Sequence, residues 1–256
     1  MTFWRALKAT YGGSLAFLAA CPLLALVPVV FELLQHGVEV HIGMYDSLAA
    51  AKATEHHPLR MGFGLLKVLS LTVPGYWIMR YLARRDPVFA ARPDPTAMRL
   101  FAGFLVFETA LAVVQLFILP PSPVVLLVGF LVGHIVDCLV AAWATAAPLG
   151  NAAIGFRASV AIMARQLPWT FVFLLAAMLP LMIPHSALGA LAIVGPKPLM
   201  WPVLIADSLL VGWLAAVIIA SFYFAAFRAA ERVGVKLVPS RSAAVAPSDE
   251  PLAVFG

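Results

Sequence analysis

The sequence predicts an all-α polytopic membrane protein, a bundle of six transmembrane helices with both termini in the cytoplasm. Of its 256 residues, 63% are hydrophobic and only 11% are charged, whereas soluble domains are about half apolar and about a quarter charged. The mean hydropathy is +0.98. Because so few polar side chains cannot cover a surface in water, much of the apolar surface must face lipid.

Six apolar segments are each long enough to cross the hydrocarbon core of a bilayer. They cover residues 14–34, 61–82, 98–119, 124–147, 169–194 and 201–227. Pro180 and Pro184 interrupt the fifth segment, and proline kinks a spanning helix. We expect one transmembrane domain over residues 1–238. A flexible cytoplasmic tail over residues 239–256, rich in Pro, Ser and Ala, would follow it.

The start of the chain has two interpretations. Arg5 and Lys8 precede an apolar run, and Cys21 follows a Leu-Ala-Ala sequence typical of lipoprotein cleavage sites. Because the apolar run continues to residue 34, we expect a retained first span, with cleavage and lipidation of Cys21 as the alternative. Cys21 and Cys138 both lie in apolar segments, so we expect buried thiols and no disulfide.

The basic residues indicate the orientation. With the N-terminus inside, 13 of the 17 Lys and Arg residues fall on the inner side. The outer side then holds only Lys52, Arg60, Lys67 and Lys197. Cytoplasmic loops are enriched in Lys and Arg, so both termini are expected in the cytoplasm. Basic span ends favour anionic lipids as partners over nucleic acid.

Two short segments have the pattern of amphipathic helices. Trp4, Leu7 and Tyr11 share one helical face near the N-terminus. Between the fourth and fifth spans the apolar positions are Phe156, Val160, Met163 and Leu167. Such helices lie in the headgroup plane of a membrane. The alternative is that each simply extends a neighbouring span.

Three features carry a family resemblance. They are the aromatic-basic start Phe3-Trp4-Arg5, the stretch from Gly155-Phe156-Arg157-Ala158-Ser159 through Arg165 to Pro168-Trp169, and the last span ending at Phe227-Arg228. In the order of these parts the chain resembles the YciC-like family of six-helix proteins of the bacterial inner membrane. The resemblance implies that membrane as the location and an envelope- or lipid-associated role, and it supplies no catalytic residues. The long acidic and His-bearing outer loop departs from that family's pattern.

Ionisable residues at membrane depth are the main candidates for function, because they are costly and usually have partners. Glu108 lies 13 residues before Pro121 and His134 lies 13 residues after it, so adjacent antiparallel helices bring them level. Asp137 follows His134 by nearly one turn. We expect one buried polar cluster, which either ties the helices together or serves as a proton relay or ion site.

Two further groups lie toward the outer side. Lys67 and Asp207 would form an ion pair across the second and sixth spans, unless Lys67 extends to the membrane surface instead. The loop over residues 35–60 is expected to be polar and solvated. Its histidines are weak candidates for metal ligands, because their spacing matches no known motif. They are His36, His41, His56 and His57.

No catalytic motif, phosphate-binding loop or cofactor motif is present in the sequence. The sequence therefore predicts a non-enzymatic inner-membrane protein without cofactors, in contact with lipids and possible neighbouring membrane subunits. Its expected role is envelope- or lipid-associated. The alternative is a small transporter or proton-linked permease subunit that uses Glu108, His134 and Asp137.

Overall fold

The computed structural model describes residues 1–120 and 122–239, and within these ranges the fold is all-α. The helices are α1 (Phe3–Ala20), α2 (Pro22–His41), α3 (Leu48–Thr54), α4 (Pro58–Thr72), α5 (Gly75–Arg84), α6 (Pro87–Ala91), α7 (Pro95–Val113), α8 (Pro123–Ala146), α9 (Phe156–Met163), α10 (Leu167–Val194) and α11 (Met200–Arg232). Residues 240–256 of the predicted tail lie outside the described residues. The predicted all-α class is confirmed.

Six helical segments in the described part of the chain are long and apolar enough to span a membrane. They are Pro22–His41, Pro58–Arg84, Pro95–Ile118, Pro123–Leu149, Phe156–Val194 and Lys197–Arg232. The protein is therefore a multi-pass integral membrane protein, as the composition predicted.

Proline and capping side chains set where several spans begin. Proline occupies the first turn of α2, α4, α7 and α8, where a missing N–H costs no hydrogen bond. The Asp94 carboxylate accepts from the backbone N–H groups of Thr96 and Ala97, both at 3.0 Å. Ser122 accepts from the N–H of Val125 at 3.3 Å. These contacts satisfy N–H groups that have no partner within the helix.

The first span differs from the expected segment 14–34. The backbone leaves the helical region at Cys21 (φ −131°, ψ 53°), and α2 then starts at Pro22. The predicted segment therefore combined the end of α1 with part of α2. Helix α2 continues to His41, so His36 and Glu39, which were expected in the loop over residues 35–60, belong to a helix.

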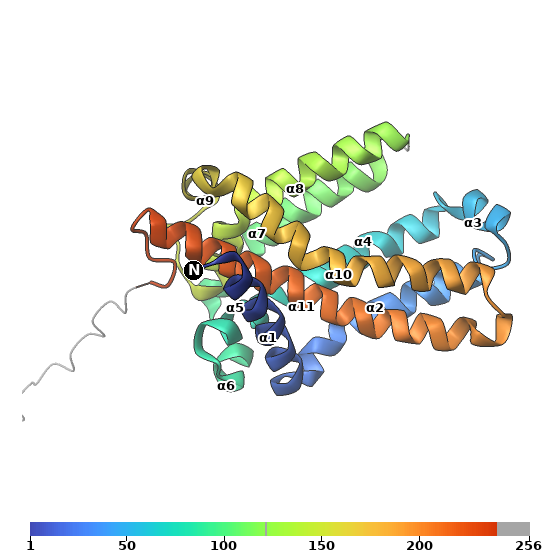
Figure 1. Cartoon of the computed structure of the whole chain (residues 1–256), viewed down its shortest axis with the longest axis horizontal. Helices are drawn as coiled ribbons and strands as arrows, with labels where there is room; N and C mark the ends of the chain where they lie inside the picture. The colour runs from blue at the N-terminus through green and yellow to red at the C-terminus, as the bar shows by residue number, and fades with distance from the viewer. Residues whose placement is uncertain (121, 240–256) are drawn as a thin grey trace, which may run out of the picture.

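Helix α11 forms the centre of the bundle and packs against α10, α1, α2 and α8 (Figure 1). Gly212 allows the close approach of α2. A Cβ atom at Gly212 would lie 2.5 Å from Cγ2 of Val29, a distance that a real side chain does not tolerate. This contact places the middle of α2 beside the first half of α11.

Helices α7 and α8 form an arm that diverges from α2, α4, α10 and α11 (Figure 1). Large apolar side chains are exposed along the first half of α8. They are Val124, Leu126, Leu127, Val128, Phe130, Leu131, Val132 and Ile135. A surface that is apolar around most of a helix is typical of contact with lipid.

The two predicted amphipathic segments are helical and pack on the bundle. In α1, Trp4 is exposed, while Tyr11 donates a hydrogen bond to the Ala177 carbonyl on α10 at 2.8 Å. In α9, the Ser159 hydroxyl donates to the Leu139 carbonyl at 2.7 Å and accepts from the Trp143 N–H at 3.0 Å. Their predicted position in the headgroup plane stays a prediction.

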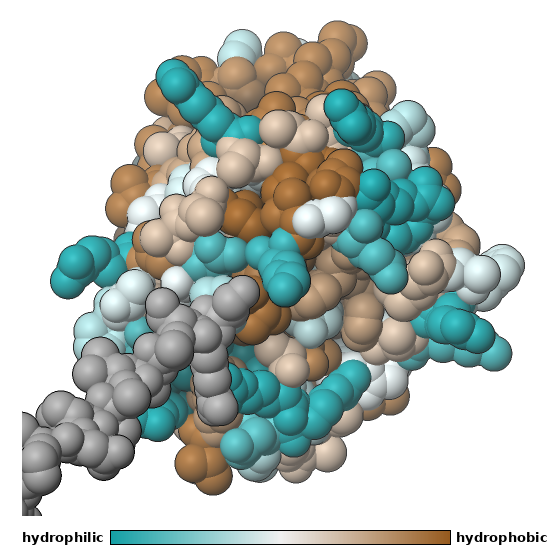
Figure 2. Space-filling model, turned by 90° about the vertical axis from the view of Figure 1, so that its left-hand side faces the viewer, coloured by the Kyte–Doolittle hydropathy of each residue, from teal (hydrophilic) through white to brown (hydrophobic). Residues whose placement is uncertain are grey.

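One end of the bundle is strongly basic. Helices α5, α6 and α9 and the end of α11 meet there. The exposed basic residues on or next to these helices include Arg84, Arg92, Arg157 and Arg232. Figure 2 shows this face, with hydrophilic side chains around an apolar centre. Arg80 is buried below it and donates to the Phe89 carbonyl at 3.1 and 3.2 Å.

Candidate ionic site between helices α2, α4, α10 and α11

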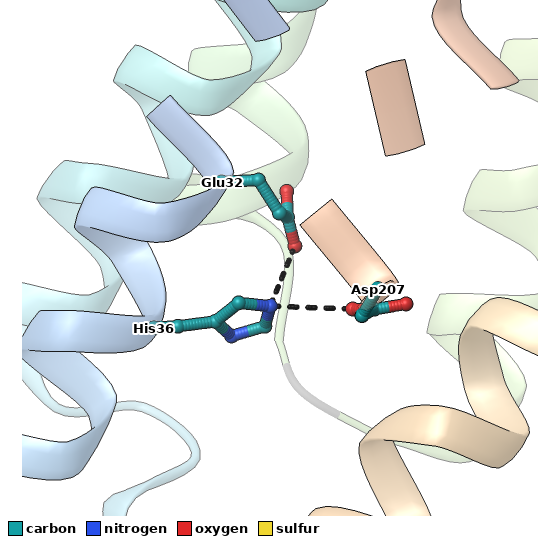
Figure 3. Close-up of side chains that lie close together, drawn as sticks. All are labelled: Glu32, His36 and Asp207. Carbon is teal, nitrogen blue, oxygen red and sulfur yellow. Dashed lines mark hydrogen bonds and ion pairs between the residues drawn. The ribbon is translucent and has the colours of Figure 1, made fainter. Parts of the chain in front are cut away.

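The site is centred on the imidazole of His36. Its Nε2 atom lies 3.5 Å from Oε1 of Glu32, one helical turn earlier, and 3.2 Å from Oδ2 of Asp207 on α11 (Figure 3). The His36 side chain is 5% exposed and the two carboxylates are 1% exposed. Glu32, His36 and Glu39 follow one another at intervals of four and three residues, so they share one face of α2.

The second ring nitrogen of His36 contacts a carboxylate and a phenol. Its Nδ1 atom lies 3.1 Å from Oε2 of Glu39 and 2.9 Å from the Tyr45 hydroxyl. Tyr45 donates its single hydroxyl hydrogen to Oε2 of Glu39 at 2.6 Å, so it cannot also donate to His36. Nδ1 must therefore carry a proton. In the neutral ring, Nε2 then presents a lone pair to two carboxylates.

Tyr45 lies in the connection after α2 and is 3% exposed. Burial, together with the negative charge of Glu39, raises the pKa of the Tyr45 phenol far above its usual value. The neutral phenol is therefore the stable form, and it remains a hydrogen-bond donor to Glu39. The backbone carbonyl of Tyr45 accepts a hydrogen bond from Lys197, which precedes α11.

Two cations from α4 face the carboxylates of α2. Nε of Arg60 lies 2.9 Å from Oε1 of Glu39, and Nζ of Lys67 lies 2.7 Å from both oxygens of Glu32. Arg60 and Lys67 are seven residues apart, which is two turns, so they lie on the same face of α4. At ordinary ionisation the site holds three carboxylates, two cations and two titratable histidines.

The second histidine comes from α10. Nδ1 of His185 lies 2.7 Å from Oδ1 of Asp207, and it is therefore bound to the oxygen that His36 does not contact. A cavity of about 170 Å³ lies among these groups and is also lined by Gln35 and Met44. The side chains of four helices thus meet around one small polar space.

Comparisons with protein-family models, with curated proteins and with solved structures find no match for this chain.

The expected solvated loop over residues 35–60 is wrong for its first part. The rest includes the helix α3, most of whose residues are exposed. His36 and Glu39 are buried in α2, at 4% and 3% exposure. Of the four weak metal candidates, only His36 joins the cluster. His41 and His56 are exposed, and His57 accepts from the N–H of Leu59 at the start of α4. The prediction failed because α2 (Pro22–His41) starts and ends later than the apolar segment 14–34 from which the span was predicted.

Lys67 and Asp207 line the same cavity, but each has a different partner from the one expected. Lys67 binds Glu32, and Asp207 binds His36 and His185. Neither the expected pair nor extension of Lys67 to the surface describes the site. The reason is that Glu32 lies inside the bundle and competes for the Lys67 ammonium group.

The expected cluster of Glu108, His134 and Asp137 is divided. Glu108 and Asp137 line one largely apolar cavity of about 190 Å³ between α4, α7, α8 and α11. His134 turns instead toward α10, where its Nε2–H donates to the Phe171 carbonyl at 3.1 Å and its ring packs edge-on against Phe171. Three residues correspond to about 300° of helix rotation, so His134 and Asp137 diverge by about 60°.

Several members of the site were not singled out as site residues from the sequence, and His185 and Tyr45 show why. His185 follows Pro184 in the fifth span, and only the prolines of that span were considered. A histidine inside an apolar span is itself a functional signal. Tyr45 lies in a connection and gave no signal, because only the turn after α2 brings its hydroxyl back to Glu39.

Proposed function

We propose that this protein is a cation-handling protein of the bacterial inner membrane, a small transporter or permease subunit. Its functional centre is the ionic site of Glu32, His36, His185 and Asp207. The main support for this proposal is the position of the His36 ring, which lies between carboxylates from α2 and α11 inside a bundle of spanning helices. The proposal moves the proton- or ion-linked role, first considered for Glu108, His134 and Asp137, to a different set of residues.

The energetics support a functional site. Each ionised group in a spanning helix costs roughly 2.5–3.5 kcal/mol by insertion scales. Well-packed apolar residues often stabilise a buried position as well as an ion pair does. A network this large is therefore an expensive means of holding helices together. The distribution of basic residues predicts that the end of the bundle with the ionic site faces the periplasm, from which a cation would enter.

Flux through proteoliposomes tests this proposal. The full chain is reconstituted into vesicles that contain a dye for protons, for Na⁺ or for Zn²⁺, and a gradient of the corresponding cation is imposed. We expect flux of at least one cation, and loss of most of it in Glu32→Gln and Asp207→Asn. Glu55→Gln, at an exposed site, serves as the matched control. Absence of flux for all three cations in the wild-type protein contradicts the proposal.

A second candidate function is the envelope- or lipid-associated, non-enzymatic role that the YciC-like resemblance implies. An apolar groove of about 480 Å³ between α5, α6 and α7 supports it, with Tyr76, Trp77 and Phe101 among its walls. Arg92, next to this groove, is exposed. An acyl chain fits such a groove, and an anionic headgroup would meet the arginine.

Lipid retention separates the second candidate from the first. The protein is purified in mild detergent, and bound lipid is counted by native mass spectrometry. The lipid role predicts one or two retained anionic lipids, fewer in Arg92→Gln and an unchanged number in Arg157→Gln. Retention that is equal in both variants argues against a specific lipid site at this groove.

A further inference from the structure

We propose that Glu32, His36 and Asp207 form a binding site for a divalent transition-metal ion, with Zn²⁺ as the best fit. This inference deepens the proposed function and rests on it, because it names the cation that the ionic site takes. One ligand atom from each of the three residues lies within 4.8 Å of the other two (Figure 3).

The protonation of His36 is the first argument. Because Nδ1 carries the proton, the neutral ring directs an unshared electron pair from Nε2 toward Glu32 and Asp207, at 3.5 and 3.2 Å. A lone pair facing two carboxylate oxygens is repulsive. Something positive must lie between them, either a proton or a metal ion. Neutral imidazole nitrogen is a common ligand for metal ions.

The spacing of the ligand atoms is the second argument. Zinc binds nitrogen and oxygen at about 2.0–2.2 Å in tetrahedral sites. This bond length puts neighbouring ligand atoms of a tetrahedron about 3.3–3.6 Å apart. The two distances from Nε2, 3.5 and 3.2 Å, lie in or close to that range. Small side-chain rotations of the two carboxylates would then complete the three-residue set.

The surroundings of the ligands are the third argument. A metal-binding histidine almost always donates its other N–H to a carboxylate or similar acceptor, which fixes the ring. The Nδ1–H group of His36 faces Glu39 and Tyr45 in this way. His185 has a similar relation to Asp207, because it contacts the oxygen that points away from His36. These outer contacts leave Nε2 of His36 and Oδ2 of Asp207 facing each other at 3.2 Å. Lys67, which contacts Glu32 at 2.7 Å, would have to move aside for Glu32 to bind the ion.

The cavity supplies room for a fourth ligand. Its volume is about 170 Å³, enough for a metal ion and water molecules. Gln35 lines it and is 7% exposed, and its carbonyl oxygen Oε1 is buried with no hydrogen-bond partner among the described residues. A water molecule on the metal would donate to this oxygen. The unpaired acceptor is independent of the His36 geometry and points to a ligand.

The chemistry of the donors selects the metal. One imidazole and two carboxylates suit Zn²⁺ or a similar first-row ion. Ca²⁺ prefers six to eight oxygen ligands, and Mg²⁺ prefers octahedral oxygen, so neither matches this set. Three carboxylates against Lys67 and Arg60 leave one negative charge when both histidines are neutral, which favours a bound cation.

Metal binding by the full chain tests the inference. The protein carries an affinity tag without histidine, is stripped with a chelator in detergent, and is titrated with Zn²⁺ against a chromophoric competitor. We expect one Zn²⁺ per chain, at least 100-fold weaker binding in His36→Gln and Asp207→Asn, and about 10-fold weaker binding in Tyr45→Phe. His41→Gln and His56→Gln are matched controls, since both residues are exposed, and should bind as the wild-type chain does.

A spectroscopic measurement does not depend on the folding of variants. Zinc X-ray absorption of the wild-type protein should show only nitrogen and oxygen ligands at about 2.0–2.1 Å, with imidazole among them. No bound zinc, zinc without imidazole, or unchanged affinity in His36→Gln would overturn the inference. If zinc is not bound while proton or Na⁺ flux persists, His36 holds a proton. The metal site then falls, and the proposed function stands.

Discussion

Nε2 of His36 lies 3.2 Å from Oδ2 of Asp207, although the two residues are 171 positions apart in the chain. The contact joins the end of the first span to the start of the last one. The other oxygen of Asp207 binds His185 at 2.7 Å. Asp207 therefore connects α2, α10 and α11, and its removal should affect the bundle as a whole.

We expect Asp207→Asn to lower the free energy of unfolding by about 3 kcal/mol, since breaking a buried ion pair leaves charge without compensation. Thermal unfolding in detergent, followed by size-exclusion chromatography of heated samples, measures the loss. Glu55→Gln, which removes an exposed carboxylate, should leave the melting temperature unchanged. Equal melting curves for Asp207→Asn and the wild-type protein would show that the network carries little stability.

Tyr45 should make the fold sensitive to alkali. Its pKa is raised in the folded state, so the folded chain keeps a proton that the unfolded chain releases above about pH 10. This stabilisation is complete below pH 10 and declines as the pH rises further, by up to about 1.4 kcal/mol per pH unit.

Tyr45→Phe should remove this part of the pH dependence. The variant is expected to be less stable at pH 8, because Glu39 loses a donor, and to lose stability less steeply between pH 10 and 11. Melting temperatures at both ends of that range give the slope. Tyr81→Phe is the matched control, since it removes a phenol on α5, away from the ionic site. An identical slope in Tyr45→Phe would contradict the assignment.

The close approach at Gly212 can be tested by compensation. Gly212→Ala places a Cβ atom against Cγ2 of Val29, and overpacking of this kind costs about 1–3 kcal/mol. Val29→Ala removes the obstructing methyl groups, so the double variant should recover part of the loss. Melting temperatures of the two single variants and the double variant measure the coupling. Additive losses would show that the helices separate at another point.

Because Glu108 and Asp137 lie together and His134 lies apart, their substitutions should show different coupling in the free energy of unfolding. Glu108 and Asp137 share a cavity, so Glu108→Gln and Asp137→Asn should be non-additive by about 0.5–3 kcal/mol. Glu108→Gln and His134→Gln should be additive within about 0.5 kcal/mol. Double-mutant cycles of unfolding in detergent provide both values. Strong coupling between Glu108 and His134 would restore the single cluster expected from the sequence.

The orientation is open to direct labelling. In a Cys21→Ala, Cys138→Ala background, single cysteines replace the exposed Lys52 and Arg157. The distribution of basic residues predicts that a membrane-impermeant maleimide labels position 52 in intact cells and labels position 157 only after the cells are broken. The reverse result would place the ionic site on the cytoplasmic side.

The sequence was sufficient for the class of fold but not for the boundaries of the first span. Hydropathy is summed over a window, and five of the six predicted windows correspond to helical segments of the structure that are long enough to span a membrane. The first window failed because hydropathy does not register the backbone break between Cys21 and Pro22. That error put His36 and Glu39, which belong to a helix, into a supposed loop.

The sequence by itself determined that six segments of the described chain are long and apolar enough to span a membrane, because the requirement to bury apolar residues in lipid acts on each segment separately. It also identified His36, Lys67 and Asp207 as residues of interest. Only the tertiary structure decided which of the membrane-depth residues meet. For example, a rotation of about 60° along α8 turns His134 away from Asp137 and toward Phe171. Helix rotation and the contact of α2 with α11 depend on packing across distant segments, which no local pattern encodes.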